Sequence, residues 1–239
     1  MANEPAALLL LHGFPLDARM WRRAVESFGA QRDVIAPNAA DLFHGEGSHT
    51  IAAMADRAAA LLNGRSAVVC GLSMGGYVAQ ELVKRHPGQV VRLVLCDTRA
   101  AGDTEEARAN RNAMIAAVRE KGVTAGTAPL VSKLLYEAAE AVRTEVTSMV
   151  AEQNSEVIVA CIEALRDRAD NTGLLADIAV PTLVVSGEHD ALSPPEIARA
   201  LTNEIRNARL ALIPASGHVP PMENPRAFNE ALANFLAGQ

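Results

Sequence analysis

Residues 67–76, with the sequence AVVCGLSMGG, decide the fold of this chain. The apolar residues 67–70 predict a buried strand, and the residues that follow Met74 predict a helix. Between them, Gly71-Leu72-Ser73-Met74-Gly75 fits the pattern G-x-S-x-G, in which a serine occupies a tight turn between strand and helix. The glycines two before and two after the serine allow a close approach of strand and helix that a side chain would block. We therefore predict that Ser73 is a nucleophile, and that the positive end of the following helix stabilises developing negative charge.

Short apolar runs alternate with longer helical stretches on both sides of this turn. This rhythm is typical of parallel strands joined by crossover helices. Most runs are continuously apolar, as expected where helices cover both faces of a sheet. The sequence predicts an α/β fold with a mostly parallel, doubly wound sheet of about six strands, at residues 6–11, 33–36, 67–70, 90–96, 182–186 and 209–213.

Two helix starts carry proline signals. Ser193 precedes Pro194 and stands three residues before Glu196, which predicts a capped helix with proline at its first position. Asn224 before Pro225 predicts the start of the last helix in the same way. The apolar residues of that helix form one buried stripe, made of Phe228, Leu232, Phe235 and Leu236.

Residues 102–177 break the alternation, because they show helical patterns and no convincing strand. Breaks are expected at Gly122, Gly126, Pro129 and Gly173. An ordinary crossover needs only about a dozen residues. We therefore predict a helical cap or lid at 102–177, inserted into a core made of residues 1–101 and 178–239.

Composition fits a globular protein and excludes several partners. The chain has 239 residues, of which 49% are apolar and 21% charged, and its net charge is −6. This charge argues against nucleic acid or an anionic membrane as the main partner. No apolar run approaches the ~20 residues of a membrane-spanning helix, and no secretory signal is recognisable. Cys70, Cys96 and Cys161 are odd in number and widely spaced, which predicts reduced thiols and a cytoplasmic protein.

A serine nucleophile needs a base, and His218 is the best candidate among the six histidines. It follows the strand 209–213 by a short loop, at the strand end where such sheets form their site crevice. Asp190 follows the strand 182–186 and gives the chain order Ser, Asp, His that is expected with this serine motif. Asp97 also ends a strand and is the rival acid. We favour Asp190, and the alternative role of Asp97 is to cap its loop.

The remaining histidines receive structural interpretations. We expect His12 to be buried and to brace its loop by hydrogen bonds, and His86 to act as a cation at a helix carboxyl end. One loop could imitate a metal site, although its spacing matches no known ligand pattern and a solvated loop is preferred. That loop contains Asp41, His44, Glu46 and His49.

Acyl transfer also requires hydrogen-bond donors for the oxyanion, and each donor lowers the reaction barrier by about 3 kcal/mol. The residue after the nucleophile supplies one donor, which here is the Met74 backbone N–H. The second donor is expected in the loop after the first strand, where Gly13 permits unusual backbone geometry. The Phe14 N–H is our candidate.

These residues resemble those of small bacterial esterases, enol-lactonases and cofactor-free haloperoxidases of the α/β-hydrolase superfamily. The resemblance covers essentially the whole chain outside 102–177. Its matching residues are Leu11-His12-Gly13-Phe14-Pro15-Leu16-Asp17, Met20-Trp21, Gly71-Leu72-Ser73-Met74-Gly75-Gly76, Val180-Pro181-Thr182-Leu183-Val184-Val185-Ser186-Gly187-Glu188-His189-Asp190, Gly217-His218 and Glu223-Asn224-Pro225.

The resemblance implies Ser73 as nucleophile, His218 as base and Asp190 as its partner, with no metal and no organic cofactor. Two departures stand out. Relatives usually begin with an antiparallel hairpin, which we expect to be missing here. The loop that begins at Pro37 is longer than the usual pattern, so no binding role is assigned to it.

The predicted reaction is hydrolysis of a small carboxylic ester or lactone. Aromatic residues make up only 3% of the chain, so an aliphatic pocket is expected, although its residues could equally pack the lid against itself. The candidate pocket residues are Met114, Leu134, Tyr136 and Val219, with Ile115, Val118 and Leu130 as further possibilities, and an enol-lactone diacid would need a cation such as Arg111, Arg119 or Lys133.

Three alternatives remain open at this stage. Pro15 beside the oxyanion donor is compatible with perhydrolysis or haloperoxidation, in which peroxide replaces water at the acyl-enzyme. Carbon–carbon bond hydrolysis fits less well, because relatives with that activity carry a more glycine-rich oxyanion loop. A receptor that keeps the three residues but binds a small ligand without turnover is the non-enzymatic alternative. The sequence specifies neither the oligomeric state nor the physiological substrate.

Overall fold

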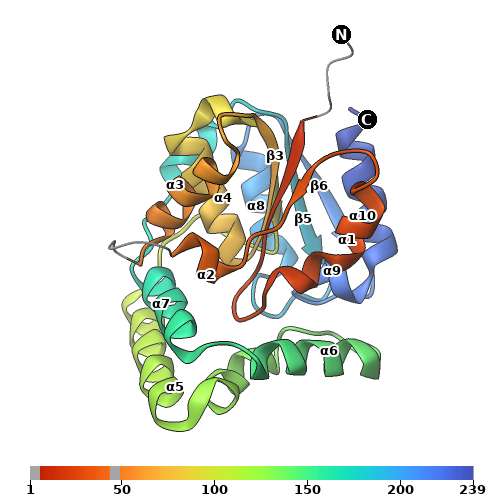
Figure 1. Cartoon of the computed structure of the whole chain (residues 1–239). Helices are drawn as coiled ribbons and strands as arrows, with labels where there is room; N and C mark the ends of the chain where they lie inside the picture. The colour runs from red at the N-terminus through yellow and green to blue at the C-terminus, as the bar shows by residue number, and fades with distance from the viewer. Residues whose placement is uncertain (1–5, 44–48, 239) are drawn as a thin grey trace.

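Six parallel strands form one sheet in the computed structural model, which describes residues 6–43 and 49–238. The strand order is β2-β1-β3-β4-β5-β6 (Figure 1). The strands are β1 (Ala7–Leu11), β2 (Val34–Ile35), β3 (Ala67–Leu72), β4 (Val90–Cys96), β5 (Thr182–Gly187) and β6 (Ala208–Ile213). The prediction of a doubly wound parallel sheet of about six strands is confirmed, and every predicted strand is present with small differences at its ends.

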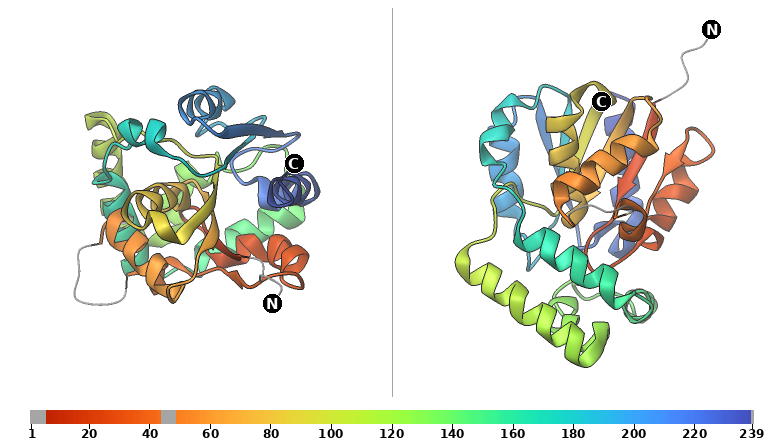
Figure 2. Two further views of the ribbon diagram at one scale, coloured as in Figure 1. Left: turned by 90° about the horizontal axis from the view of Figure 1, so that it is seen from above. Right: turned by 60° about the vertical axis from the view of Figure 1, so that its left-hand side comes forward.

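Helices cover both faces of this sheet. On one face α3 packs against α4, and α8 lies against β5 and β6; on the other face α1 packs against α10 (Figures 1 and 2). The Trp21 and Phe228 rings join the second pair, with centroids 5.8 Å apart. These helices are α1 (Arg22–Phe28), α3 (Ile51–Leu61), α4 (Met74–Arg85), α8 (Pro195–Glu204) and α10 (Pro225–Leu236). Shorter elements are η1 (Ala18–Trp21), α2 (Ala39–Leu42), η2 (Pro87–Gln89), η3 (Thr172–Asp177) and α9 (Pro220–Glu223).

The strand register places five loops at one edge of the sheet. β1 lies between β2 and β3, so the chain winds in opposite directions from this point, and a crevice forms beside the carboxyl ends of the strands. Leu11 pairs with Gly71, and Leu72 pairs with Cys96. Cys96 in turn pairs with Val185, and Gly187 pairs with Ile213. The residues that directly follow β1, β3, β4, β5 and β6 therefore meet at the same edge.

Close backbone contacts explain the glycines around the β3–α4 turn. A methyl group added at Gly71 would overlap the carbonyl of Gly75, and one added at Gly75 would overlap the carbonyl of Leu11. At Gly76 the added atom would lie 2.5 Å from Thr98 Oγ1. The glycines thus allow α4 to start directly against β1 and β4, which fixes the height of the turn above the sheet.

A helical segment connects β4 to β5 and lies beside the carboxyl ends of the strands (Figure 1). Within the described residues it contains no strand, as the sequence predicts. Its helices are α5 (Glu105–Val131), α6 (Glu140–Ala151) and α7 (Ser155–Arg166), and α5 packs against α7. Its separation from the core as a distinct lid stays a prediction.

Within this segment the breaks predicted at Gly126 and Pro129 are wrong, because α5 continues through both residues. The kink lies at Gly122, where φ is +80°. A Cβ atom at Gly126 would come within 2.6 Å of Val118. Gly126 therefore allows the two halves of α5 to pack closely across the kink, rather than ending the helix.

The prediction that Ser193 caps a helix is also wrong. Helix α8 begins at Pro195, and Pro194 is its N-cap residue. A residue that precedes proline favours an extended backbone, so the second proline of the pair becomes the first helical residue. The start of α10 is confirmed, because the Asn224 side chain accepts a hydrogen bond from the Ala227 N–H.

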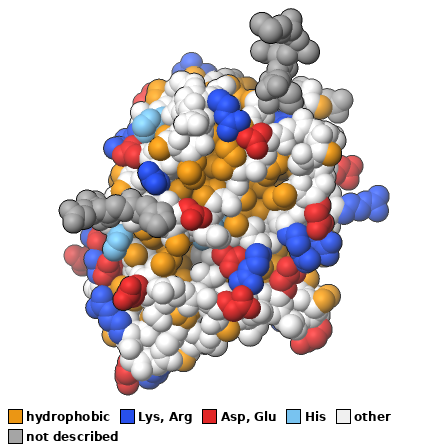
Figure 3. All heavy atoms as spheres, in the orientation of Figure 1, with side chains coloured by type: hydrophobic (Ala, Val, Ile, Leu, Met, Phe, Trp, Pro, Cys, Tyr) orange, Lys and Arg blue, Asp and Glu red, His pale blue; other side chains and the backbone are white. Residues whose placement is uncertain are grey.

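The surface carries charges of both signs. On the face shown in Figure 3, Lys and Arg side chains lie among Asp and Glu side chains and form no single basic patch. No helix in the described ranges has the length and apolar character that crossing a bilayer requires. The three thiols are free and buried, and burial raises the pKa of each; they belong to Cys70, Cys96 and Cys161.

Candidate active site

Ser73 occupies the turn between β3 and α4 in a strained backbone conformation. Its φ and ψ are 52° and −109°, a region that residues other than glycine rarely adopt. Two hydrogen bonds from the β4 side hold it there. The Ser73 N–H donates to the Cys96 carbonyl at 2.9 Å, and the Thr98 hydroxyl donates to the Ser73 carbonyl at 2.9 Å. Because strain of this kind persists only where the surroundings enforce it, the turn is a candidate functional site.

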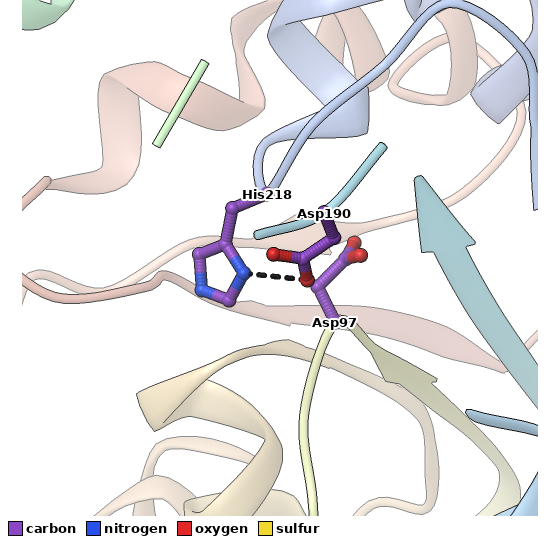
Figure 4. Close-up of side chains that lie close together, drawn as sticks. All are labelled: Asp97, Asp190 and His218. Carbon is purple, nitrogen blue, oxygen red and sulfur yellow. Dashed lines mark hydrogen bonds and ion pairs between the residues drawn. The ribbon is translucent and has the colours of Figure 1, made fainter. Parts of the chain in front are cut away.

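His218 and Asp190 form a buried pair at the same edge of the sheet. His218 Nδ1 and Asp190 Oδ2 are 2.8 Å apart, and the second ring nitrogen of His218 points away from the acids (Figure 4). The other oxygen of Asp190 accepts the N–H groups of Leu192 at 2.8 Å and Ser193 at 3.0 Å. Burial by itself would raise the pKa of Asp190, but the hydrogen bond and charge interaction with His218, with these N–H donors, lower it below its ordinary value. The acid is therefore ionised at neutral pH and orients the imidazole ring.

Asp97, the rival acid, lies beside this pair but binds other partners. Its Oδ1 accepts the Gly187 N–H at 2.9 Å, and its Oδ2 accepts the Cys96 thiol at 3.1 Å. Figure 4 shows its carboxyl group next to that of Asp190. Complete burial, followed by the neighbouring Asp190 charge, raises the pKa of Asp97 well above 3.8. The two acids therefore differ in the direction of their pKa shifts, and the one with the lowered pKa, Asp190, contacts the histidine.

Asp97→Asn is expected to stabilise the protein at neutral pH. Asp97 has an ordinary pKa of 3.8, and its folded-state pKa is raised, so between these two values the folded chain holds a proton that the unfolded chain has lost. The free energy of unfolding therefore falls as pH rises through this window, by at most about 1.4 kcal/mol per pH unit. Asparagine keeps the shape of the neutral acid but does not titrate, so the variant does not lose this free energy of unfolding as pH rises.

Urea unfolding of wild type and Asp97→Asn from about pH 5 to about pH 8 measures the effect. The difference in unfolding free energy should grow with pH until the pKa of Asp97 is passed. Parallel curves for the two proteins would show that Asp97 is already ionised in the folded chain.

A cavity of about 200 Å³ joins the serine turn to the histidine. Ser73, His218 and Phe14 are among its lining residues. No hydrogen bond between the Ser73 hydroxyl and His218 is present in the described ranges, and serine–histidine bonds of this kind often tighten only when substrate binds. The backbone N–H groups of Phe14 and Met74 also have no hydrogen-bond partner among residues 6–43 and 49–238. They are free to donate to a ligand.

The helical segment is docked onto the His218 loop by backbone hydrogen bonds. The His218 N–H donates to the Leu134 carbonyl at 2.8 Å. The Tyr136 N–H donates to Glu223 Oε2 at 2.7 Å, while Glu223 Oε1 accepts the N–H groups of Gly217 and Val219, each at 3.0 Å. Burial raises the pKa of Glu223. Glu223 therefore links the segment to the loop, a role that its place in the Glu-Asn-Pro motif did not reveal.

Of the candidate pocket residues, Leu130 lines the cavity, whereas four others lie around it. Leu134 is buried behind His218, and the Tyr136 ring stacks on His189 with centroids 3.7 Å apart. Val219 is fully buried, and Met114 is half-buried on α5. None of these four belongs to the residues found to line the cavity in the described chain.

Charged residues that the sequence did not single out line the cavity instead. Arg99, Asp103 and Arg168 are among them, together with Arg111, which the sequence proposed as a cation. The other two cations that the sequence suggests face solvent. Arg119 is 65% exposed beside Glu163, and Lys133 is exposed.

The other histidines in the described ranges lie outside the cavity. His12 Nδ1 lies 3.0 Å from the Gly13 carbonyl, and its Nε2 accepts the Ala39 N–H at 2.8 Å, so the ring braces the loop that follows β1, as predicted. Burial lowers the pKa of His12. His86 caps α4 and bonds Asp56 at 2.7 Å. His44 and Glu46 of the loop that could imitate a metal site lie outside the described residues, and His49 is exposed.

Among the described residues, one cluster offers three ligand atoms within 4.8 Å of one another: Asp97, Asp190 and His218. Every carboxyl oxygen in it already accepts a hydrogen bond from a backbone N–H, the thiol or the imidazole. The donor set therefore fits a hydrogen-bonded acid–histidine pair better than an open metal site.

Comparison with known proteins supports the class that this geometry suggests. Over 264 residues the chain is 24% identical to a pimeloyl-[acyl-carrier protein] methyl ester esterase of Nitrosospira multiformis, covering 98% of this chain and 95% of the relative. Over 171 residues it is 29% identical to 3-oxoadipate enol-lactonase 2 of Acinetobacter baylyi, covering 70% and 62% of the two chains. The solved structure of a thermophilic esterase from Thermogutta terrifontis, with malate bound, superimposes with a TM-score of 0.92 at 34% identity, covering 98% and 90%.

A parallel sheet with a strained serine turn and a buried histidine–acid pair defines a hydrolase of the α/β class. The model of the alpha/beta hydrolase family matches residues 8–231. The chain belongs to this family, and it is an enzyme of the hydrolase class.

Proposed function

We propose that the protein hydrolyses small carboxylic esters or lactones through an acyl-enzyme on Ser73. One observation carries the proposal: the strained Ser73 turn opens into the same cavity as His218, and the His218 ring is held by an ionised Asp190. The names of the relatives add support, since an esterase and an enol-lactonase both cleave a bond between an acyl carbon and oxygen.

In this mechanism His218 takes the proton of the Ser73 hydroxyl as the oxygen attacks the substrate carbonyl. Asp190 keeps the imidazole in the tautomer whose outer nitrogen can accept that proton. The free N–H groups of Phe14 and Met74 are the proposed oxyanion donors. His218 then gives the proton to the leaving alcohol oxygen. His218 next takes a proton from a water molecule as the water oxygen attacks the acyl-enzyme, and returns that proton to the Ser73 oxygen as the acyl–oxygen bond breaks. The carboxylic acid and free Ser73 are the products.

A phosphonate with a para-nitrophenyl leaving group tests the nucleophile directly. Attack by the Ser73 oxygen forms an oxygen–phosphorus bond and expels one para-nitrophenolate per chain. We expect the adduct mass on the peptide that contains Ser73, with loss of esterase activity in the same proportion. Labelling of another residue, while ester turnover continues, would refute the assignment.

A panel of aryl esters of rising acyl length, with several lactones, then identifies the substrate class. Steady turnover with water supports the hydrolase. A burst of product without further turnover would favour the receptor alternative, and product formation that requires peroxide would favour perhydrolysis.

We also propose that the enzyme works in the cytoplasm on a small molecule. The three free, buried thiols fit a reducing compartment. A fusion to a redox-insensitive fluorescent reporter in a bacterial host, followed by cell fractionation, tests the location.

A further inference from the structure

The cavity beside Ser73 has an unusual charge balance. Three guanidinium groups line it, from Arg99, Arg111 and Arg168, against the single carboxylate of Asp103. They come from distant parts of the chain, because Arg99 follows β4, Arg111 lies on α5 and Arg168 follows α7. Core and helical segment thus both contribute cations to one small space.

Asp103 neutralises only part of this charge. One of its oxygens pairs with Arg168, and the other accepts Arg111 Nε at 3.2 Å. Arg99 pairs with no carboxylate in the described ranges; its Nη2 donates to the Leu192 carbonyl and the Ser193 hydroxyl, which are neutral oxygens. Because guanidinium groups stay protonated in proteins, the wall keeps excess positive charge at every physiological pH.

The three arginines differ in how much hydrogen-bonding capacity remains. The Arg168 side chain is 4% exposed, stacks 4.4 Å from the Tyr77 ring centroid, and donates to the carbonyls of Leu165 and Ala101. It is a fixed part of the wall. Arg111 is 20% exposed, and its recorded hydrogen bond uses Nε alone. Its two Nη groups have no partner among the described residues, so they can still receive two carboxylate oxygens.

We propose that this cavity is a subsite for a carboxylate group of the substrate, with Arg111 and Arg99 as its donors; the inference rests on the proposed function of Ser73. A planar carboxylate matches the free fork of Arg111, and the excess charge compensates its desolvation. The space of about 200 Å³ equals that of roughly seven water molecules, which suits a short acid chain. The enzyme therefore acts on small esters or lactones that carry an acid group, in preference to neutral esters.

Matched substrates test this preference. Monomethyl glutarate is compared with methyl 5-methylhexanoate, in which an isopropyl group replaces the carboxylate on the acyl half. Acetoxyacetate is compared with isobutyl acetate for a carboxylate on the alcohol half. We expect kcat/KM to be about 10- to 100-fold higher for the charged member of at least one pair, as for a charged hydrogen bond.

Two arginines of α5 provide a matched pair of variants. Arg111→Gln should lower kcat/KM for the charged ester far more than for its neutral partner, which removes the preference, and Arg111→Lys should restore part of it. Arg119→Gln is the control, because Arg119 lies on the same helix, also makes one ion pair and lies outside the cavity. Equal kcat/KM for charged and neutral esters, or a preference that survives Arg111→Gln, would overturn the proposal.

A binding measurement separates failure of the subsite from failure of the proposed chemistry. Calorimetry with glutarate and the Ser73→Ala protein needs no turnover. Binding that weakens in the double variant with Arg111→Gln, but not with Arg119→Gln, supports the subsite even if no ester is hydrolysed. Absence of glutarate binding to Ser73→Ala, or equal affinity in all three proteins, overturns it.

Discussion

Ser73→Ala is expected to lower kcat for a simple aryl ester by about a million-fold, the loss typical of removing a serine nucleophile. The variant cannot form the acyl-enzyme. The proposed oxyanion donors can then stabilise only the direct attack of water on the substrate. The fold should be unaffected, because the Ser73 hydroxyl makes no hydrogen bond in the described ranges and the bonds that hold the turn use its backbone. Steady-state kinetics and thermal unfolding measure the two properties separately.

Ser155→Ala is a suitable control, since Ser155 is exposed at the start of α7 and is outside the cavity. It should match wild type in both measurements. Wild-type turnover by a folded Ser73→Ala protein would remove Ser73 from the mechanism and leave the strained turn without a function.

Asp190→Asn is expected to lower kcat by about 10⁴-fold, the second largest effect, because an amide cannot hold the imidazole in the required tautomer. The Asp190 Oδ1 atom already accepts two backbone N–H groups. An asparagine that keeps these bonds presents its NH₂ group to His218 Nδ1, so the ring protonates on the outer nitrogen. That nitrogen can then no longer accept the serine proton.

Asp97→Asn gives the matched comparison for this acid. The two residues lie side by side, but only Asp190 bonds His218, so Asp97→Asn should cost far less activity (Figure 4). The kinetic comparison at one pH is therefore decisive. If the losses were reversed, Asp97 would be the acid of the mechanism and Asp190 its support.

The sequence predicts the sheet and the serine turn well because both depend on local chemistry. Continuous apolar runs between polar helices specify buried parallel strands, and two glycines around Ser73 specify a sharp turn. The helix ends inside the helical segment are less well predicted. Gly126 reads as a helix break, yet it serves the packing of α5 against itself, which depends on Val118 eight residues earlier.

The choice between the two acids shows what the sequence alone does not determine. Asp97 comes directly after β4, and Asp190 comes three residues after the end of β5. Chain order favours Asp190, but both acids follow strands that end at the same edge of the sheet, so the sequence does not show which of them contacts the histidine. The hydrogen bonds of the folded protein separate them, since Gly187 and Cys96 bind Asp97 while His218 binds Asp190. The same burial then gives one acid a raised pKa and the other a lowered one.

The sequence by itself determined the α/β architecture, the serine turn and the strand ends at which the histidine and the acids lie. Only the tertiary structure decided the character of the cavity, by bringing Arg99, Arg111 and Arg168 together around Asp103. An arginine on a solvated helix face and one that lines a cavity look alike in sequence. What separates them is the burial and pairing of each charge, and these depend on contacts between residues far apart in the chain.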